Sequence, residues 1–183
     1  IYDSVKGDVP FRFNTSITRI DNQPDGVVVE FSNGESQQYD LVIGADGIHS
    51  NVRKQLWGAE SQFNRFLGFY VACSVIDNFL GNEDTFYGHF EPNVQATIFS
   101  IGGNQLATFF AFRSEKLNVH GRSAQIDVLT NVFGSAGWIM PQLLEATKRT
   151  DDLFFDAVAQ IQLNEWHKGR VALVGDACQC LTL

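Results

Sequence analysis

Residues 40 to 58 read Asp40-Leu-Val-Ile-Gly-Ala-Asp-Gly-Ile-His-Ser-Asn-Val-Arg-Lys-Gln-Leu-Trp-Gly58 and predict a strand, a glycine turn and a short helix in direct succession. The apolar residues 41–43 are typical of a strand that is buried on both faces. The glycines of Gly44-Ala-Asp-Gly47 permit a tight turn and a close approach of the backbone to a ligand. Ser50 is a favourable N-cap for a helix over residues 51–57. This succession predicts a place where an anionic group can be held.

A second stretch near the end of the sequence has the same character. It reads Lys168-Gly-Arg-Val-Ala-Leu-Val-Gly-Asp-Ala177, an apolar strand that runs directly into a Gly-Asp turn. Asp176 of this turn follows Asp46 of the first turn by 130 positions.

Both turns resemble motifs of the flavin-dependent monooxygenases that share the fold of para-hydroxybenzoate hydroxylase. The D-G motif of that family has a strand, Asp-Gly, two residues, Ser, one residue and Val-Arg. This sequence matches it with Asp46, Gly47, Ser50, Val52 and Arg53. The second turn is similar to the G-D motif of the same family, which also places a substrate domain of about this size between the two motifs.

The resemblance implies six cofactor-binding residues, which are Asp46, Gly47, Arg53, Gly175, Asp176 and Ala177. Those of the G-D motif would contact FAD, and those of the D-G motif would support the pyrophosphate region and nicotinamide access. The implied reductant is NADH or NADPH. No catalytic side chain is expected, because the reduced flavin itself activates dioxygen as a C4a-hydroperoxide. Relatives usually have a histidine after Gly-Asp-Ala, whereas this sequence has Cys178-Gln-Cys-Leu181, so the role of that histidine does not carry over.

The composition narrows the range of partners. The sequence has 21 acidic and 13 basic residues, a net charge of −8, and no Lys/Arg cluster longer than two, so neither nucleic acid nor a membrane surface is expected as a partner. Three cysteines do not form a disulfide framework, and four scattered histidines give no metal-ligand spacing, so no metal is expected. With no apolar run of 18 residues, we expect a cytoplasmic protein that binds a small organic molecule. The oligomeric state is not indicated.

The sequence predicts a strand meander before the first motif, and a separate sheet with two helices between the two motifs. Residues 9–43 predict a three-stranded meander over 11–20, 27–31 and 37–43. Phenylalanine-rich strands are predicted at 66–76, 85–90, 94–101 and 105–113, as an antiparallel sheet of about four strands. Helices over 122–133 and 141–148 are predicted to pack on the back of this sheet, and a strand over 153–163 leads towards the second motif.

Four residues of this sheet are candidates for substrate binding: Tyr87, His89, Phe99 and Phe110. In the family that the motifs resemble, one face of such a sheet roofs the flavin ring and encloses the organic substrate. Aromatic side chains suit that role because they bury a flat apolar molecule. They suit a plain hydrophobic core equally well, and solvent exposure is an alternative for Tyr87 and His89, which lie two apart on one face of a strand.

The predicted fold is therefore mixed α/β (α+β). Residues 1–60 would form part of a Rossmann-like FAD-binding domain, residues 61–164 a substrate-binding domain with an antiparallel sheet and helices on its back, and residues 165–183 a return to the first domain. The Gly-x-Gly-x-x-Gly phosphate cradle is absent from the sequence, which begins with Ile1 and has one methionine. The chain is therefore expected to be an internal fragment that is inactive by itself.

The parent protein is expected to be an FAD-dependent monooxygenase that hydroxylates an aromatic or polycyclic substrate. Within the same superfold a halogenase, an epoxidase or a reductase is an alternative. A different alternative is a non-catalytic module that binds a small molecule or a partner protein. A two-domain nicotinamide dehydrogenase is disfavoured, because Gly-x-Gly-x-x-Gly is lacking.

Overall fold

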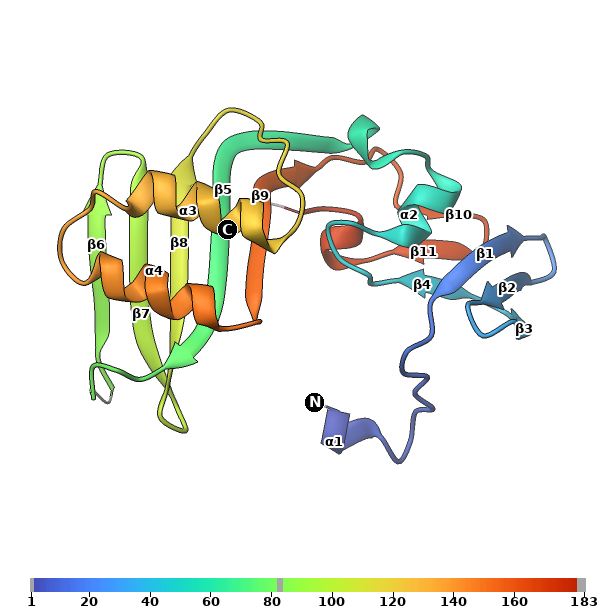
Figure 1. Cartoon of the computed structure of the whole chain (residues 1–183). Coiled ribbons are helices and arrows are strands. Elements are labelled where there is room, and N and C mark those ends of the chain that lie inside the picture. Colours follow the sequence, from blue (N-terminus) through green and yellow to red (C-terminus); the bar gives the residue numbers. More distant parts are fainter. Residues whose placement is uncertain (1, 82–83, 181–183) are drawn as a thin grey trace. The chain divides into compact units, whose positions relative to one another are not determined.

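The computed structural model describes residues 2–81 and 84–180, which form two compact units (Figure 1). Unit 1 comprises the described residues up to Arg65 and those from Ala159 onwards, and unit 2 is Phe66–Val158. Strands and helices are mixed in the chain, which confirms the predicted fold class. The boundaries between the units lie at residues 65/66 and 158/159, whereas the sequence predicted domain boundaries at 60/61 and 164/165. Each boundary falls inside a strand, because β5 (Asn64–Asp77) and β9 (Leu153–Ile161) both continue from one unit into the other.

Unit 1 contains two three-stranded sheets. The first is antiparallel and has the order β1 (Ile17–Asn22), β2 (Val27–Phe31), β3 (Ser36–Tyr39). The second has the order β10 (His167–Lys168), β11 (Val171–Leu173), β4 (Val42–Gly44), with β11 antiparallel to β10 and parallel to β4. The helical elements are α1 (Tyr2–Val5), α2 (Asn51–Leu56) and the 3-10 turns η1 (Glu60–Gln62) and η2 (Gly175–Ala177).

The predicted meander is wrong in its third strand. Residues 37–43 do not form one strand, because β3 and β4 belong to different sheets. Arg170 fixes the break between them: its guanidinium donates to the Asp40 carbonyl at 3.0 Å, and its own carbonyl accepts from the Val42 amide at 3.0 Å. The first predicted strand, 11–20, begins only at Ile17, whose partner Phe31 is the last residue of β2.

The prediction that residues 41–43 are buried on both faces is also wrong for the described chain. Leu41 and Ile43 are each 56% exposed, whereas Val42 packs against the core of unit 1. The alternation arises because described residues cover only one face of β4, the face to which Val42 points. The core on that face contains Val27, Val29, Val52, Val171 and Leu173.

Unit 2 is built on a five-stranded sheet with the order β6 (Phe86–Glu91), β7 (Val94–Gly102), β8 (Gln105–Arg113), β5, β9. The pairs β6–β7, β7–β8 and β5–β8 are antiparallel, as the sequence predicted. The fifth strand, β9, is the one predicted to lead towards the second motif.

Helices α3 (Arg122–Phe133) and α4 (Met140–Arg149) cover one face of this sheet, which confirms their predicted position (Figure 1). The Phe133 ring on α3 meets the Phe110 ring on β8 edge-on, with centroids 5.1 Å apart. Arg122 joins the two helices, because its guanidinium donates at 3.0 Å to the carbonyls of Thr147 and Lys148 at the end of α4. These are carbonyls that a helix leaves without partners of its own. No helix among residues 2–81 and 84–180 is long and apolar enough to cross a membrane.

Candidate functional site

The D-G turn is held together by its own aspartate. One carboxylate oxygen of Asp46 accepts from the Ser50 hydroxyl at 2.5 Å, and the other accepts from the Val52 amide at 3.0 Å. The Ser50 oxygen in turn accepts from the Arg53 amide at 2.9 Å, which makes Ser50 the predicted N-cap of α2. The carboxylate of Asp46 therefore fills the start of α2, the place where the sequence predicted room for an external anion.

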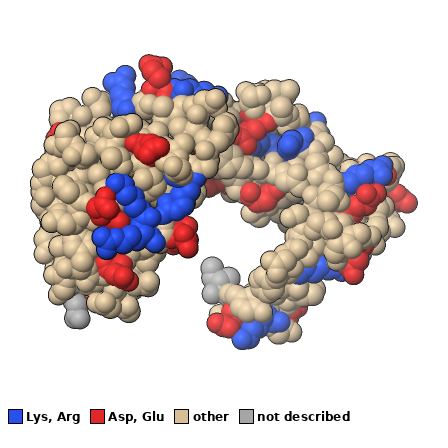
Figure 2. Space-filling model, in the orientation of Figure 1, with Lys and Arg blue, Asp and Glu red and all other residues tan. Residues whose placement is uncertain are grey.

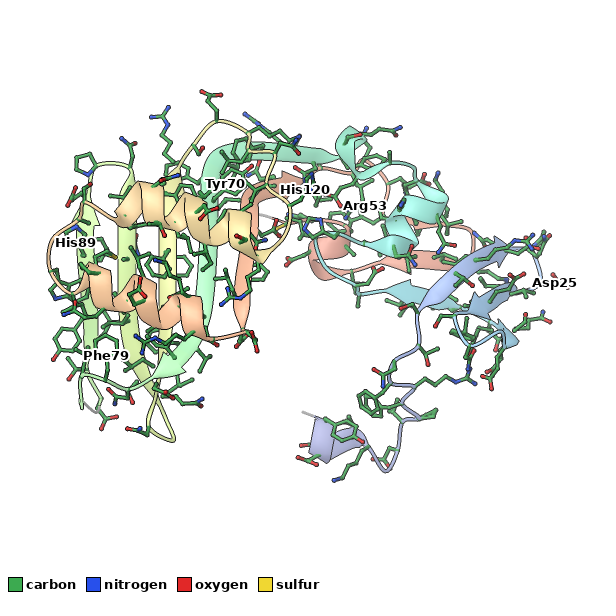
Figure 3. All side chains as sticks on the ribbon, viewed as in Figure 1. Asp25, Arg53, Tyr70, Phe79, His89 and His120 are labelled. Atoms are coloured by element: carbon green, nitrogen blue, oxygen red, sulfur yellow. The ribbon has the colours of Figure 1, made fainter. Side chains whose placement is uncertain are left out.

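Arg53 is the largest fully buried side chain of the chain's described residues, with an exposed fraction of 0%. Its guanidinium donates to the carbonyl of Ile48 at 2.5 Å and to the carbonyl of Ala177 at 2.9 Å. Burial lowers the pKa of Arg53, while the carboxylates of Glu60 and Asp46 act in the opposite direction. Arg53 is therefore an internal tie of the fold and not a solvated helix residue (Figure 3).

The tie to Ala177 brings the two motifs together within unit 1. Strands β4 and β11 are parallel neighbours, with Leu173 opposite Gly44, so both motif turns leave the same edge of the sheet. The Val174 amide donates to the Gly44 carbonyl at 3.0 Å, which continues the pairing up to the G-D turn. Residues 130 positions apart in sequence thus form one continuous surface at the carboxyl ends of two parallel strands, where open α/β sheets bind their ligands.

The G-D turn presents its aspartate to solvent. Gly175 has φ +58°, and a Cβ placed on it would have no atom within 4 Å, so the backbone here is open to close approach. The side chain of Asp176 is exposed and makes no hydrogen bond or ion pair within the described residues. Ala177 is buried, and its carbonyl is the acceptor for Arg53. Asp176 is therefore the motif carboxylate that is free to accept a hydrogen bond, whereas Asp46 is engaged within the fold.

Glu60 completes this arrangement and was not predicted from the sequence. Its carboxylate lies 3.0 Å from His49 Nδ1 and 3.6 Å from the Arg53 guanidinium, and it accepts a hydrogen bond from the side-chain amide of Asn64 at 3.0 Å. Glu60 is the first residue of the 3-10 turn η1 and belongs to no motif, so no local pattern marks it. It is the acidic partner that compensates the buried charge of Arg53.

The Glu60→Gln variant is expected to lower the free energy of unfolding by about 1–3 kcal/mol, because the buried charge of Arg53 would lose the larger of its two acidic neighbours' contributions. Urea unfolding measures this difference. Glu30→Gln is the matched control: Glu30 pairs with Arg19 at 3.0 Å, but both side chains are well exposed, so that loss should stay within about 1 kcal/mol. Equal losses in the two variants would contradict the role given to Glu60.

Gly44 is the position at which β4 passes closest to its neighbours. A Cβ there would lie 2.7 Å from Leu173 Cδ2 and 2.9 Å from Val52 Cβ. We expect Gly44→Ala to destabilise the protein by about 1–3 kcal/mol through overpacking. Gly137→Ala, at a loop position with nothing within 4 Å, should change stability by no more than about 0.5 kcal/mol. Thermal unfolding of both variants tests this difference.

The second candidate region is the face of the unit 2 sheet that α3 and α4 leave uncovered, called the open face below. Five phenylalanines lie on it with exposed fractions between 39% and 64%: Phe69, Phe86, Phe90, Phe99 and Phe154. The rings of Phe86 and Phe99 are stacked across β6 and β7, with centroids 6.2 Å apart. Cys73 lies opposite Phe109 on this face, and burial raises the pKa of its thiol. The open face offers a flat apolar surface within unit 2.

The four residues predicted to bind substrate do not share one face. Phe99 lies on the open face, but Tyr87, His89 and Phe110 point to the side of α3 and α4. Tyr87 and His89 lie beside Trp138 in the connection between these helices, and the His89 ring stacks on Trp138 with centroids 6.2 Å apart. Phe110 is fully buried against Phe133, so it is a core residue and not a surface for a ligand. The alternative of a plain core therefore describes Phe110.

Comparison with known proteins extends over almost the whole chain. No family model matches it. A flavin-dependent monooxygenase of Legionella longbeachae is 37% identical over 176 residues, which cover 94% of this chain and 45% of that protein. In sequence and fold, the chain is thus similar to about half of a flavin-dependent monooxygenase. The solved structure of the tetracycline destructase Tet(51) superposes with a TM-score of 0.86 at 32% identity, covering 98% of this chain and 50% of that one.

The relatives that match are longer than this chain. The uncharacterized protein Rv1260 of Mycobacterium tuberculosis is 36% identical over 183 residues, covering 98% of this chain and 49% of that protein. The chain thus spans about half the length of the curated relatives it matches. The strands, the two motifs and the sheet of unit 2 lie inside that half.

Proposed function

We propose that the paired D-G and G-D turns bind FAD, and that the whole protein is an FAD-dependent monooxygenase. The observation that best supports this proposal is the Asp176 carboxylate, which is exposed and has no partner among the described residues. It follows the open backbone of Gly175, and the hydrogen bond from Arg53 to the Ala177 carbonyl holds the turn in place. These residues fit the cofactor. A carboxylate can accept a hydrogen bond from a ribityl or ribose hydroxyl, and a glycine without neighbours lets the chain approach it closely.

The remaining motif residues support the site from within. Asp46 and Ser50 fix the D-G loop, and Gly47 leaves that loop open, since a Cβ on it would have no atom within 4 Å. Arg53 fixes the G-D turn through its hydrogen bond to the Ala177 carbonyl. Its Nε atom is buried and has no hydrogen-bond partner in the described structure, so this donor remains available to a bound group or a water molecule. In this proposal Asp46 and Arg53 act by positioning, and Asp176 and Gly175 contact the cofactor.

Bound FAD, reduced by NADH or NADPH, supplies the oxygen-activating chemistry of this enzyme class. The chain contributes the open face of unit 2 as a surface for an aromatic or polycyclic molecule, with Phe99 and Phe86 as stacking partners. Tetracycline is a suitable first probe, because a similar structure is named a tetracycline destructase. A second candidate, a small-molecule-binding module without turnover, is favoured by the lack of Gly-x-Gly-x-x-Gly in these 183 residues.

The proposed activity is tested by following oxidation of NADPH and NADH by the FAD-loaded protein, prepared at the full length of its relatives, with and without tetracycline or planar polycyclic phenols. We expect at least one of these compounds to accelerate nicotinamide oxidation and to yield an oxygenated product. A protein that holds FAD but responds to none of them would overturn the proposed activity while leaving FAD binding intact.

A further inference from the structure

Unit 2 has a pocket of about 830 Å³ that the proposed function does not use. It lies where the end of β5 meets the side of α4, and we call it the α4 pocket. Its apolar lining includes Val75, Ile76 and Phe79 on the sheet side and Pro141 and Ala146 on α4. Figure 3 shows Phe79 on the α4 side of the unit. The volume falls within the range of about 300–1,000 Å³ that is usual for small-molecule sites.

The charges around the α4 pocket are few and can be assigned. Glu145 is engaged, because Lys148 donates to its carboxylate at 2.7 Å, and this hydrogen bond lowers the pKa of Glu145. Asp77 and Arg149 also line the pocket, and neither side chain makes a hydrogen bond or ion pair with any residue that the structure describes. Figure 2 shows that acidic and basic side chains lie side by side on this part of unit 2. Arg149 also lies close enough to Glu145 to act on its charge. Beside its apolar lining, the pocket therefore presents the Asp77 carboxylate and the Arg149 guanidinium without hydrogen-bond partners among the described residues.

We propose that the α4 pocket binds a small amphoteric aromatic molecule, with its anionic group on Arg149, its cationic group on Asp77 and its flat body against Phe79 and the apolar lining. Both charges are needed, because a purely anionic ligand would meet the carboxylate of Asp77 and a purely cationic one the guanidinium of Arg149. Phe79, which is 43% exposed, provides the aromatic surface for stacking. The site differs from the open face and does not depend on FAD.

The test uses L-tryptophan as the amphoteric probe and two derivatives that each lack one charge. N-acetyl-L-tryptophan has no cationic group, and L-tryptophan methyl ester has no anionic group. Each is titrated into the isotopically labelled 183-residue chain, and binding is followed by amide shifts in NMR spectra. Arg149→Gln and Asp77→Asn remove the two charges of the pocket. Arg113→Gln is the matched control, because Arg113 is an exposed arginine of unit 2 at the end of β8, away from the pocket.

We expect L-tryptophan to shift the amide signals of residues 75–79 and of α4 in a saturable manner. It should bind about two- to fivefold more tightly than either derivative, which is the effect of one partly exposed ion pair. Arg149→Gln and Asp77→Asn should each weaken binding by a similar factor, and Arg113→Gln should not. Shifts centred on the open face, or equal affinities for all three compounds in the unmodified chain, would overturn the proposal without any variant having to fold.

Discussion

Replacing Arg53 with methionine is expected to lower the free energy of unfolding of unit 1 by about 3 kcal/mol or more. Methionine fills much of the space of the arginine stem but donates no hydrogen bond. The carbonyls of Ile48 and Ala177 would lose their buried donor, and Glu60 would lose its cationic partner. Each buried acceptor left unsatisfied costs about 1–3 kcal/mol, and the contributions act on the same turn.

Urea unfolding followed through the amide NMR signals of unit 1 measures this loss. Arg19→Met is the matched control, because Arg19 pairs with Glu30 at 3.0 Å on the surface and should contribute no more than about 1 kcal/mol. Arg53→Lys should restore only part of the loss, since one ammonium cannot reproduce the planar fork that reaches both carbonyls. If Arg53→Met were as stable as Arg19→Met, the tie between the two motifs would have no energetic importance.

The Asp176→Ala variant is expected to weaken the affinity for FAD by about tenfold to a hundredfold, which is the effect of one lost hydrogen bond to a charged acceptor. The same variant should unfold within about 0.5 kcal/mol of the unmodified protein, because the Asp176 side chain is exposed and has no partner in the described structure. Arg53→Met, in contrast to Asp176→Ala, should lower both the free energy of unfolding and the affinity for FAD. The comparison therefore separates a residue that contacts the cofactor from one that positions the turn.

Equilibrium dialysis against FAD, with the full-length protein, provides the affinity. Asp25→Ala removes the same charge from an exposed turn of unit 1 and serves as the control (Figure 3). We expect its FAD affinity to match that of the unmodified protein, because net charge alone should not matter. An Asp176→Ala variant that keeps the full affinity would show that the carboxylate does not contact the cofactor.

Local patterns were sufficient to predict most of the elements of the fold. The apolar runs before Gly44 and Gly175, the cap at Ser50 and the phenylalanine-rich runs of β5 to β8 are all encoded within a few residues. The parallel pairing of β4 with β11 is not encoded locally, because the paired residues lie 129 positions apart in the sequence. The bend at Asp40 depends likewise on the distant Arg170, so the break between β3 and β4 had no local signal.

The site was less predictable than the fold, for two physical reasons. A strand alternates between two faces, and the sequence shows which residues share a face but not which face the helices cover. Tyr87 and His89 do share a face, but it is the one beside Trp138. Burial also depends on tertiary contacts: Arg53 has the sequence context of a surface helix residue, and its partner Glu60 lies outside every motif.

The most direct test of the central claim is the visible flavin spectrum of the protein, prepared at the length of its relatives, after incubation with FAD and removal of the unbound cofactor. The paired turns predict one retained FAD per chain in the unmodified protein and a markedly smaller amount in Asp176→Ala, with Asp25→Ala unchanged. An unmodified, folded protein that retains no flavin would contradict the assignment of the two turns as a cofactor site.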